Sequence, residues 1–310
     1  MRSEKPKRKK RKGLRIVGLV LLLLIIAVGV YVGVVYNSLS SAVDTMHQEV
    51  ERTPTKERTD TLELKKQEPF SVLMLGVDER DGDSGRSDTM IVLSVNPEKE
   101  SVKMLSIPRD TRTEIVGHGT TDKINHAYAF GGVAMALDTV ENFLDIPIDY
   151  YIQVNMEGFS QIVDAVGGVT VDNDLDFTYE GVHFPKGQLT LNGDKALKFS
   201  RMRYEDPRGD FGRQLRQRSI IQAVINEGAS LNSLKNFDDI FDALGNNVKT
   251  DITFNEMVSI QANYRSVAKT IDQLTIEGTG QRIDGIYYLI VDDAEKTRIQ
   301  TEMKDQLNIQ

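Results

Sequence analysis

Hydrophobic and polar positions divide the 310-residue chain into three parts. Residues 16–36 form an apolar run without a charged residue, and at about 1.5 Å of rise per residue roughly 20 helical residues cross a hydrocarbon core of about 30 Å. Residues 37–68 are polar and rich in Thr, Lys and Glu, which is typical of a juxtamembrane helix and linker. The pattern therefore predicts a transmembrane anchor at 16–36, a linker at 37–68 and one folded domain over 69–310.

Within 69–310, two periodicities alternate along the chain. Short runs of β-branched and apolar residues predict strands at 70–76, 89–95, 102–107, 150–154, 274–277 and 287–291. Apolar residues at helical spacing predict helices at 132–144, 157–166, 216–226, 254–269 and 293–307. Alternating strands and helices of this length indicate a single α/β domain with a mixed central sheet flanked by helices.

Charge sets the expected orientation of the anchor. Residues 1–15 hold nine of the 38 Lys and Arg residues and one of the 46 Asp and Glu residues, so the remainder has 29 basic and 45 acidic residues and a formal charge of −16. A basic cluster before an apolar span is retained in the cytoplasm. We expect a cytoplasmic tail at 1–15 and a single-pass membrane protein of type II with its domain outside the cell; a cleaved signal peptide is the alternative.

The same charges bear on the partners of the protein. The membrane span accounts for the basic tail, and the strongly acidic body repels nucleic acid at long range, so we expect no nucleic-acid partner. The chain has no cysteine, which excludes a disulfide framework, a thiolate metal site and a cysteine nucleophile. Any site for a phosphorylated ligand must therefore be a local concentration of arginine on an acidic domain.

Two carboxylates flank the loop between the first two predicted strands. Asp78 follows the first strand and Asp88 precedes the second, so the two ends of the loop bring them together. Mg²⁺ takes one or two protein carboxylates and completes its coordination with water and phosphate oxygens. This pair predicts a Mg²⁺ site, which Mn²⁺ could also occupy; a solvated acidic hairpin loop is the alternative.

Two further segments are rich in arginine. Arg109 follows the strand 102–107, at the edge where open α/β sheets bind ligands, although a surface pair with Asp110 is the alternative. Residues 200–218 contain six Arg and no Lys. A guanidinium grips phosphate with two parallel hydrogen bonds, whereas an ammonium is a point charge. The second segment predicts a phosphate-binding site, the alternative being a solvated charged helix start.

The segment 123–132 lies between these stretches and carries one candidate base. His126 is either a catalytic base or, more commonly for a lone histidine near an apolar run, a structural group. Asn125 is expected to cap the helix that follows.

Five motifs in order identify a resemblance. The sequences LGVDER, GRSDT, SIPRDT, KINHAYAFGG and DPRGDFGRQLRQR resemble the LytR-CpsA-Psr family, and the match extends from about residue 70 to the C-terminus. Within the family, the likeness is to the transferases of teichoic acid in Gram-positive bacteria. The resemblance implies an apolar tunnel for a polyprenyl tail, with the pyrophosphate at its charged mouth and peptidoglycan as the acceptor.

The resemblance also implies roles for single residues. Asp78 and Asp88 match the acidic positions associated with Mg²⁺ and catalysis, and Arg109 combines phosphate binding with catalysis. The other phosphate-facing positions that it implies are Arg80, Arg86, Arg201, Arg203, Arg213, Arg216 and Gln217. Which aspartate acts as the base stays open, because a carboxylate among several arginines has a depressed pKa.

Four functions remain compatible with these patterns. The expected one is phosphotransfer of an anionic glycopolymer from an undecaprenyl-pyrophosphate carrier in the membrane to a peptidoglycan hydroxyl. The same site could instead hydrolyse the pyrophosphate with water as acceptor. The other two alternatives are a membrane-linked transcriptional attenuator, which the short cytoplasmic tail disfavours, and a lipid-binding protein without catalysis.

Overall fold

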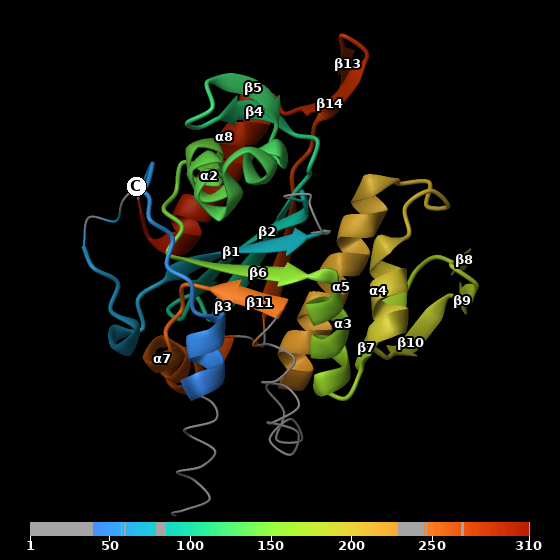
Figure 1. Cartoon of the computed structure of the whole chain (residues 1–310), viewed down its shortest axis with the longest axis horizontal. Coiled ribbons are helices and arrows are strands. Elements are labelled where there is room, and N and C mark those ends of the chain that lie inside the picture. Colours follow the sequence, from blue (N-terminus) through green and yellow to red (C-terminus); the bar gives the residue numbers. More distant parts are fainter. Residues whose placement is uncertain are drawn as a thin grey trace, which may run out of the picture.

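The computed structural model describes residues 40–56, 58, 60–78, 85–228, 245, 247–267 and 270–309. Its centre is a six-stranded mixed sheet with the order β11-β6-β1-β2-β3-β12 (Figure 1). The strands are β1 (Phe70–Val77), β2 (Ser87–Asn96), β3 (Ser101–Ile107), β6 (Tyr150–Asn155), β11 (Val248–Thr250) and β12 (Ile271–Thr275). Strands β1–β2, β2–β3 and β6–β11 pair antiparallel, whereas β1–β6 and β3–β12 pair parallel. The expected α/β domain with a mixed sheet is confirmed.

Helices cover both faces of this sheet, on opposite sides in Figure 1. The helices are α2 (His126–Leu144), α3 (Met156–Ala165), α4 (Gly193–Arg201), α5 (Asp210–Gly228), α7 (Phe254–Tyr264), α8 (Asp293–Leu307) and the 3-10 helix η1 (Leu64–Lys66). Alternate residues of β1 point to opposite faces. Leu73, Leu75 and Val77 therefore join a buried cluster with α2 and α8, while Phe70 and Val72 face η1 and α7.

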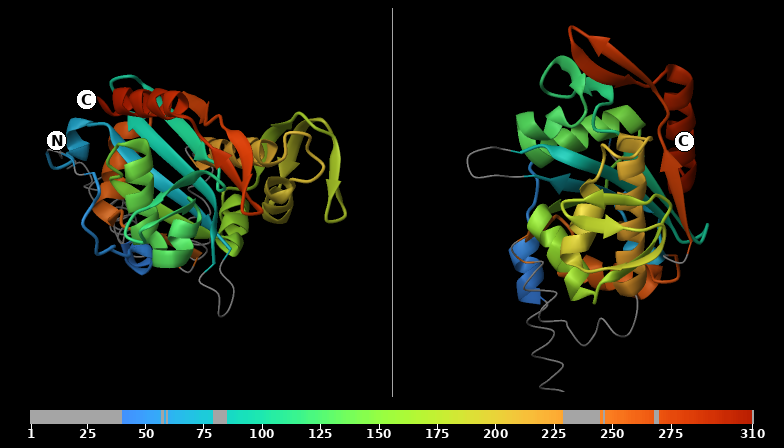
Figure 2. Two further views of the ribbon diagram at one scale, coloured as in Figure 1. Left: turned by 90° about the horizontal axis from the view of Figure 1, so that it is seen from above. Right: turned by 90° about the vertical axis from the view of Figure 1, so that its right-hand side faces the viewer.

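A smaller lobe lies beside the six-stranded sheet and has its own hydrophobic core. Helices α3, α4 and α5 pack around their own cluster, in which the rings of Phe177, Phe184 and Phe199 lie 5.0–5.7 Å apart. The lobe also contains β7 (Val169–Asn173), β8 (Phe177–Tyr179), β9 (Val182–Phe184) and β10 (Gly187–Leu191). Helix α5 contacts both β7 and strand β3 of the six-stranded sheet, and β8–β9 projects from the body (Figure 2). Helix α5 therefore joins the lobe to the sheet.

Two short hairpins lie beyond the sheet near α2, namely β4 (Arg112–Ile115) with β5 (Thr120–Lys123) and β13 (Thr279–Ile283) with β14 (Ile286–Ile290). Of these four strands, the sequence predicted only the last. The structure also adds α4, which the sequence did not predict because it is short and largely polar. Its start is fixed by the side chain of Asn192, which accepts a hydrogen bond from the Lys195 amide.

Helix α2 begins six residues before its predicted start. Its first turn is separated from the rest by non-helical backbone at Gly131 and Gly132, where Gly132 has a φ of 62°, which glycine adopts without strain. Asn125 stands at the cap position, but its side chain makes no capping hydrogen bond and its Oδ1 is buried without a partner in the structure. The predicted position of Asn125 at the start of a helix is thus confirmed, whereas the side-chain hydrogen bond of a cap is absent among the described residues.

Residues before Pro69 are packed on the domain, whereas the sequence placed the domain boundary there. Val43 and Met46 are buried against β11, and the Arg52 guanidinium forms two hydrogen bonds with the Glu141 carboxylate on α2, at 2.8 and 2.9 Å. Glu141 is fully buried and also accepts from the Thr55 amide at 2.9 Å. The segment 43–55 is therefore attached by apolar and ionic contacts that could not be predicted from its polar composition.

Glu141→Ala is expected to lower the free energy of unfolding by about 3 kcal/mol, because it leaves the Arg52 charge buried without its main partner. Chemical denaturation of the wild type and the variant measures the change. Glu114→Ala, at an exposed position of β4, serves as the control and should change stability by less than about 0.5 kcal/mol. Equal effects of the two substitutions would contradict a structural role for the Arg52–Glu141 pair.

The anchor predicted at 16–36 and the tail predicted at 1–15 lie outside the described residues. In the part of the chain that the structure describes, no helix has the length and apolar character needed to cross a membrane.

Candidate functional site

The β1–β2 hairpin directs Asp88 by means of a bulge. Gly76 pairs with Thr89 and the next residue, Val77, pairs with Ser87, so Asp88 is the extra residue on β2. Such bulges re-aim a side chain and occur often beside active sites. The amide of Asp78 donates to the carbonyl of Arg86 at 3.3 Å and closes the same end of the hairpin. The predicted placement of Asp78 and Asp88 at neighbouring strand ends is confirmed.

Arg109 reaches this edge from the end of β3. Its Nη1 donates to Asp88 Oδ1 at 2.7 Å, and its Nε lies 3.8 Å from Asp110 Oδ2 without a hydrogen bond. Burial opposes the charge of Arg109, but the hydrogen bond and charge of Asp88 outweigh this effect and raise the pKa of Arg109. The guanidinium stays charged, and its Nε is a donor without a hydrogen-bond partner among the described residues.

The start of α5 adds a second buried arginine. Arg213 is 8% exposed, and its Nη2 lies 2.6 Å from Asp210 Oδ1 in the first turn. Its Nε has no hydrogen-bond partner among the described residues. Burial, together with the charges of Arg109 and Arg203, lowers the pKa of Arg213 against the opposing effect of Asp210. Arg109 and Arg203 therefore both lie close enough to act on the charge of Arg213, which is an arrangement that favours a multivalent anion.

Arg216 has a different environment from the one predicted. It is 4% exposed, and its Nη1 donates to Asp206 Oδ2 at 2.6 Å. Its Nε and Nη2 donate to the carbonyls of Phe199 and Met202, at 3.1 and 2.5 Å. Its guanidinium also lies 5.3 Å from the centre of the Phe177 ring. The structure thus commits Arg216 to holding α4, α5 and the intervening turn together, and we leave it out of the proposed ligand set.

The remaining predicted residues are distributed around this centre. Arg203 is half-buried, with its guanidinium 5.1 Å from the centre of the exposed Tyr204 ring. Gln217 is half-buried on α5, whereas Arg86 and Arg201 are exposed. Arg80 lies outside the described residues. Phosphate binding by each of these residues stays a prediction.

The sequence interpretation missed the residue that organises the arginine-rich turn. Asp206 is buried and binds both Arg208 and Arg216, with N–O distances of 2.9 and 2.6 Å. The close approach of α5 requires Gly212, because a Cβ there would lie 1.9 Å from Asp206 Oδ2. The available signal was Asp206-Pro-Arg-Gly before a helix start, which is a turn sequence.

The carboxylates at the strand ends fit a hard cation. The part of the chain that the structure describes has no group of three or more His, Asp or Glu able to hold a metal, but Mg²⁺ needs only one or two protein carboxylates. The bulge places Asp88 at this edge, and Arg109 donates a hydrogen bond to Oδ1 of its carboxylate. Asp78 and Asp88 therefore remain the residues that would hold Mg²⁺.

His126 lies near the site but is held by another carboxylate. Its Nδ1 is 2.7 Å from Asp122 Oδ2, and the Tyr288 hydroxyl donates to Asp122 Oδ1 at 3.1 Å. Its ring also meets the edge of Phe130. These contacts fit the structural interpretation of His126.

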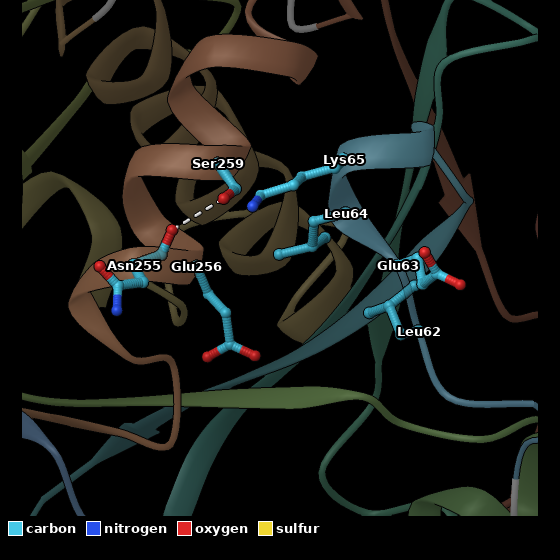
Figure 3. A pocket seen from close by; sticks show the side chains of 7 residues that line it. All are labelled: Leu62, Glu63, Leu64, Lys65, Asn255, Glu256 and Ser259. Carbon is cyan, nitrogen blue, oxygen red and sulfur yellow. Dashed lines mark hydrogen bonds between the residues drawn. The ribbon is translucent and has the colours of Figure 1, made fainter.

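A pocket of about 230 Å³ lies elsewhere, between η1 and α7 (Figure 3). It is lined by Leu62, Glu63, Leu64, Lys65, Asn255, Glu256 and Ser259. The two carboxylates outnumber the single lysine, so the pocket does not suit a phosphorylated ligand. It also flanks the N-terminal end of β1, opposite the end that carries Asp78.

Comparisons with known proteins agree with the fold and the motifs. TagU of Bacillus subtilis (strain 168), a polyisoprenyl-teichoic acid–peptidoglycan teichoic acid transferase, is 48% identical over 307 residues, which cover 99% of each chain. The crystal structure of B. subtilis TagU matches with a TM-score of 0.63 and 50% identity, over 77% of this chain and 97% of that one. A structure of TagT bound to LIIa-WTA matches with a TM-score of 0.73 and 30% identity, over 85% and 100%. The LytR-CpsA-Psr family model matches residues 32–305, and the chain belongs to this family.

Proposed function

We propose that the chain is a polyisoprenyl-teichoic acid–peptidoglycan teichoic acid transferase that works in cell wall assembly. It moves an anionic glycopolymer from a polyprenyl-pyrophosphate carrier to a hydroxyl of peptidoglycan. The observation that carries this proposal is the cluster of Arg109, Arg203 and Arg213 around Asp88 and Asp210, in a chain 48% identical to TagU. Donors that stay unsatisfied beside a carboxylate suit a pyrophosphate.

The reaction exchanges the phosphoanhydride bond of the pyrophosphate for a phosphoester bond to the acceptor. The acceptor hydroxyl oxygen forms a bond to the phosphorus that carries the glycan, and the bond from that phosphorus to the bridging oxygen breaks. The hydroxyl proton is lost, and polyprenyl monophosphate leaves with the bridging oxygen. Because negative charge builds on the transferred and leaving phosphates, positioned guanidinium groups stabilise the transition state more than the ground state. Arg109 and Arg213, with unsatisfied Nε groups, fill this role.

Asp88 is the candidate to receive the acceptor proton, with Asp78 as its neighbour. Asp88 Oδ1 accepts a hydrogen bond from Arg109 Nη1 at 2.7 Å, which holds the carboxylate in place, so its main contribution is to position the hydroxyl. When bound at Asp78 and Asp88, Mg²⁺ or Mn²⁺ would neutralise phosphate charge.

The lipid would lie on the sheet face that α5 and α7 cover. Met74, Leu93 and Ile152 point to this face and stay half-buried. Each buried methylene contributes about 0.8 kcal/mol, so an apolar channel here would supply much of the affinity for a polyprenyl tail. The apolar run at 16–36 and the basic residues before it support a type II anchor, which would keep this face near the carrier membrane.

Product analysis tests the proposal and separates it from hydrolysis. The full-length protein in detergent would be incubated with a polyprenyl-pyrophosphate-linked glycan, peptidoglycan oligomers and Mg²⁺. We expect glycan attached to peptidoglycan fragments through a phosphodiester, together with polyprenyl monophosphate. Release of free glycan phosphate in place of attached glycan would show a hydrolase, and no turnover of the lipid would leave only a binding or regulatory protein.

A further inference from the structure

Arg218 is a buried cation that the proposed reaction does not yet use. It is 1% exposed and is the largest of the fully buried side chains among the described residues. Its Nε donates to Gln273 Oε1 at 3.0 Å, and its Nη1 has no hydrogen-bond partner among the residues that the structure describes. Among the described residues, no carboxylate forms an ion pair with it, and burial alone lowers the pKa of Arg218 to about 10. A buried arginine usually has a carboxylate partner, so this one lacks its expected counter-charge.

The position of Arg218 relates it to the phosphate site. It follows Arg213 by five residues on α5, which corresponds to about 7.5 Å along the helix axis. Its partner Gln273 lies on β12 opposite Met104 of β3. The side chain therefore points to the sheet, on the face that carries the half-buried Met74 and Leu93. Arg218 thus lies deeper along this face than Arg213.

A second unsatisfied group lies on the same face. Ser106 of β3 is 2% exposed, and within the described part of the chain its Oγ has no hydrogen-bond partner. It stands two residues beyond Met104, in register with Thr275 of β12, so its side chain points to the same side as that of Gln273. Ser106 is also three residues before Arg109, which ties this layer of the sheet to the candidate site.

These groups are costly unless a ligand engages them. An unpaired buried charge opposes folding, and a buried hydroxyl without a partner adds to this cost. An anion at this position would satisfy Arg218 Nη1 and Ser106 Oγ together. Because the surrounding sheet face is apolar, an anion attached to a hydrocarbon chain suits it better than a fully hydrated one.

We propose that Arg218, with Ser106 and Gln273, forms a second anion position that binds the phosphate of polyprenyl monophosphate, the product that remains after transfer. This inference rests on the proposed function. The lipid-side phosphate is the one closest to the apolar face, and it gains negative charge when the bridging bond breaks. Arg218 would receive that phosphate as it moves away from Arg109 and Arg213, and would separate it from the glycan.

Arg218→Met provides the test, because ligand binding and stability should change in opposite directions. Without ligand, the variant should unfold at a higher temperature than the wild type, since an apolar side chain replaces an unpaired charge. Its affinity for a polyprenyl monophosphate should fall at least 10-fold, about 1.4 kcal/mol. Its affinity for the uncharged polyprenol of equal length should not change. Both are measured on the full chain in detergent, with Arg282→Met, at an exposed hairpin position, as the control.

The other possible results show whether this inference, the identity of the ligand or the proposed function is wrong. If polyprenyl monophosphate binds Arg218→Met as tightly as the wild type, the inference is wrong while the proposed function stands. If inorganic phosphate displaces bound polyprenyl monophosphate at a concentration as low as that of unlabelled polyprenyl monophosphate, the position binds free phosphate equally well. The assignment to the lipid is then wrong. If Arg218→Met lowers the unfolding temperature, Arg218 also has a structural role, and binding is then compared in Arg218→Lys, which keeps the charge. Wild-type affinity of Arg218→Lys for polyprenyl monophosphate, with the preference over polyprenol unchanged, would support the inference. Loss of that preference in Arg218→Lys would contradict it.

Discussion

Asp88→Ala is expected to lower the rate of glycopolymer transfer at least 100-fold without weakening the binding of the lipid substrate. Asp88 lies at the bulge that aims it into the site, 2.7 Å from Arg109. Its removal takes away the group that positions the acceptor hydroxyl, and losses of this kind amount to about 10²–10⁴-fold. It also leaves Arg109 free to bind phosphate, so the KM for the carrier should stay constant or fall while kcat falls.

Steady-state kinetics with lipid-linked glycan and peptidoglycan oligomers measure both parameters for Asp88→Ala. Asp172→Ala, at an exposed position of β7, is the matched control and should retain wild-type kcat. Circular dichroism verifies that Asp88→Ala folds. A variant with wild-type kcat, or one whose loss lies entirely in KM for the carrier, would contradict the role assigned to Asp88.

Asp206→Ala is expected to lower the free energy of unfolding by about 3–5 kcal/mol. It removes the only carboxylate that the described residues place against the guanidinium of Arg216, at 2.6 Å, and so leaves a buried charge unpaired. Asp174→Ala provides a sharp control, because Asp174 also binds Arg208 but is 63% exposed. Its loss should cost less than about 1 kcal/mol. Similar midpoints of denaturation for the two variants would refute the central role of Asp206.

The same residue predicts an acid dependence of stability. Burial would raise the pKa of Asp206, but hydrogen bonds from Arg208 and Arg216 outweigh it and lower the pKa to about 2. The unfolded value is about 3.9. Because the folded pKa is depressed, the stabilisation is complete above about pH 4 and is lost as the pH falls toward 2. Denaturation curves between pH 2 and 5 should show this loss in the wild type and a weaker one in Asp206→Ala.

Much of the framework could be predicted from the sequence because it depends on local patterns. The strands that form the site follow from alternating or continuous apolar runs, and Asp78 and Asp88 flank one hairpin loop, so their proximity follows from chain connectivity. The bulge at Asp88 could not be predicted, since it depends on the register between β1 and β2. The small hairpins were missed because their strands are short and mostly exposed.

The arginine-rich segment shows where prediction from the sequence ended. Helical spacing placed Arg213 and Arg216 on one face, but it could not reveal that Asp206 and two carbonyls occupy the guanidinium of Arg216. These partners come from α4 and the turn after it. The sequence does not distinguish Arg218 from the other arginines of this segment. Only its packing against the sheet shows that it is buried without a carboxylate partner among the described residues. One run of arginines thus divides into residues proposed to bind phosphate, a structural residue and a buried residue without a carboxylate partner among the described residues.

A crystal structure of the protein with a polyprenyl-pyrophosphate-linked glycan tests the central claim most directly. We expect the two phosphates to contact Arg109 and Arg213 beside Asp88, with the polyprenyl chain running between α5 and the sheet face that carries Met74 and Leu93. Phosphates bound away from Arg109 and Arg213, or a chain that lies outside the layer between α5 and the sheet, would contradict the account.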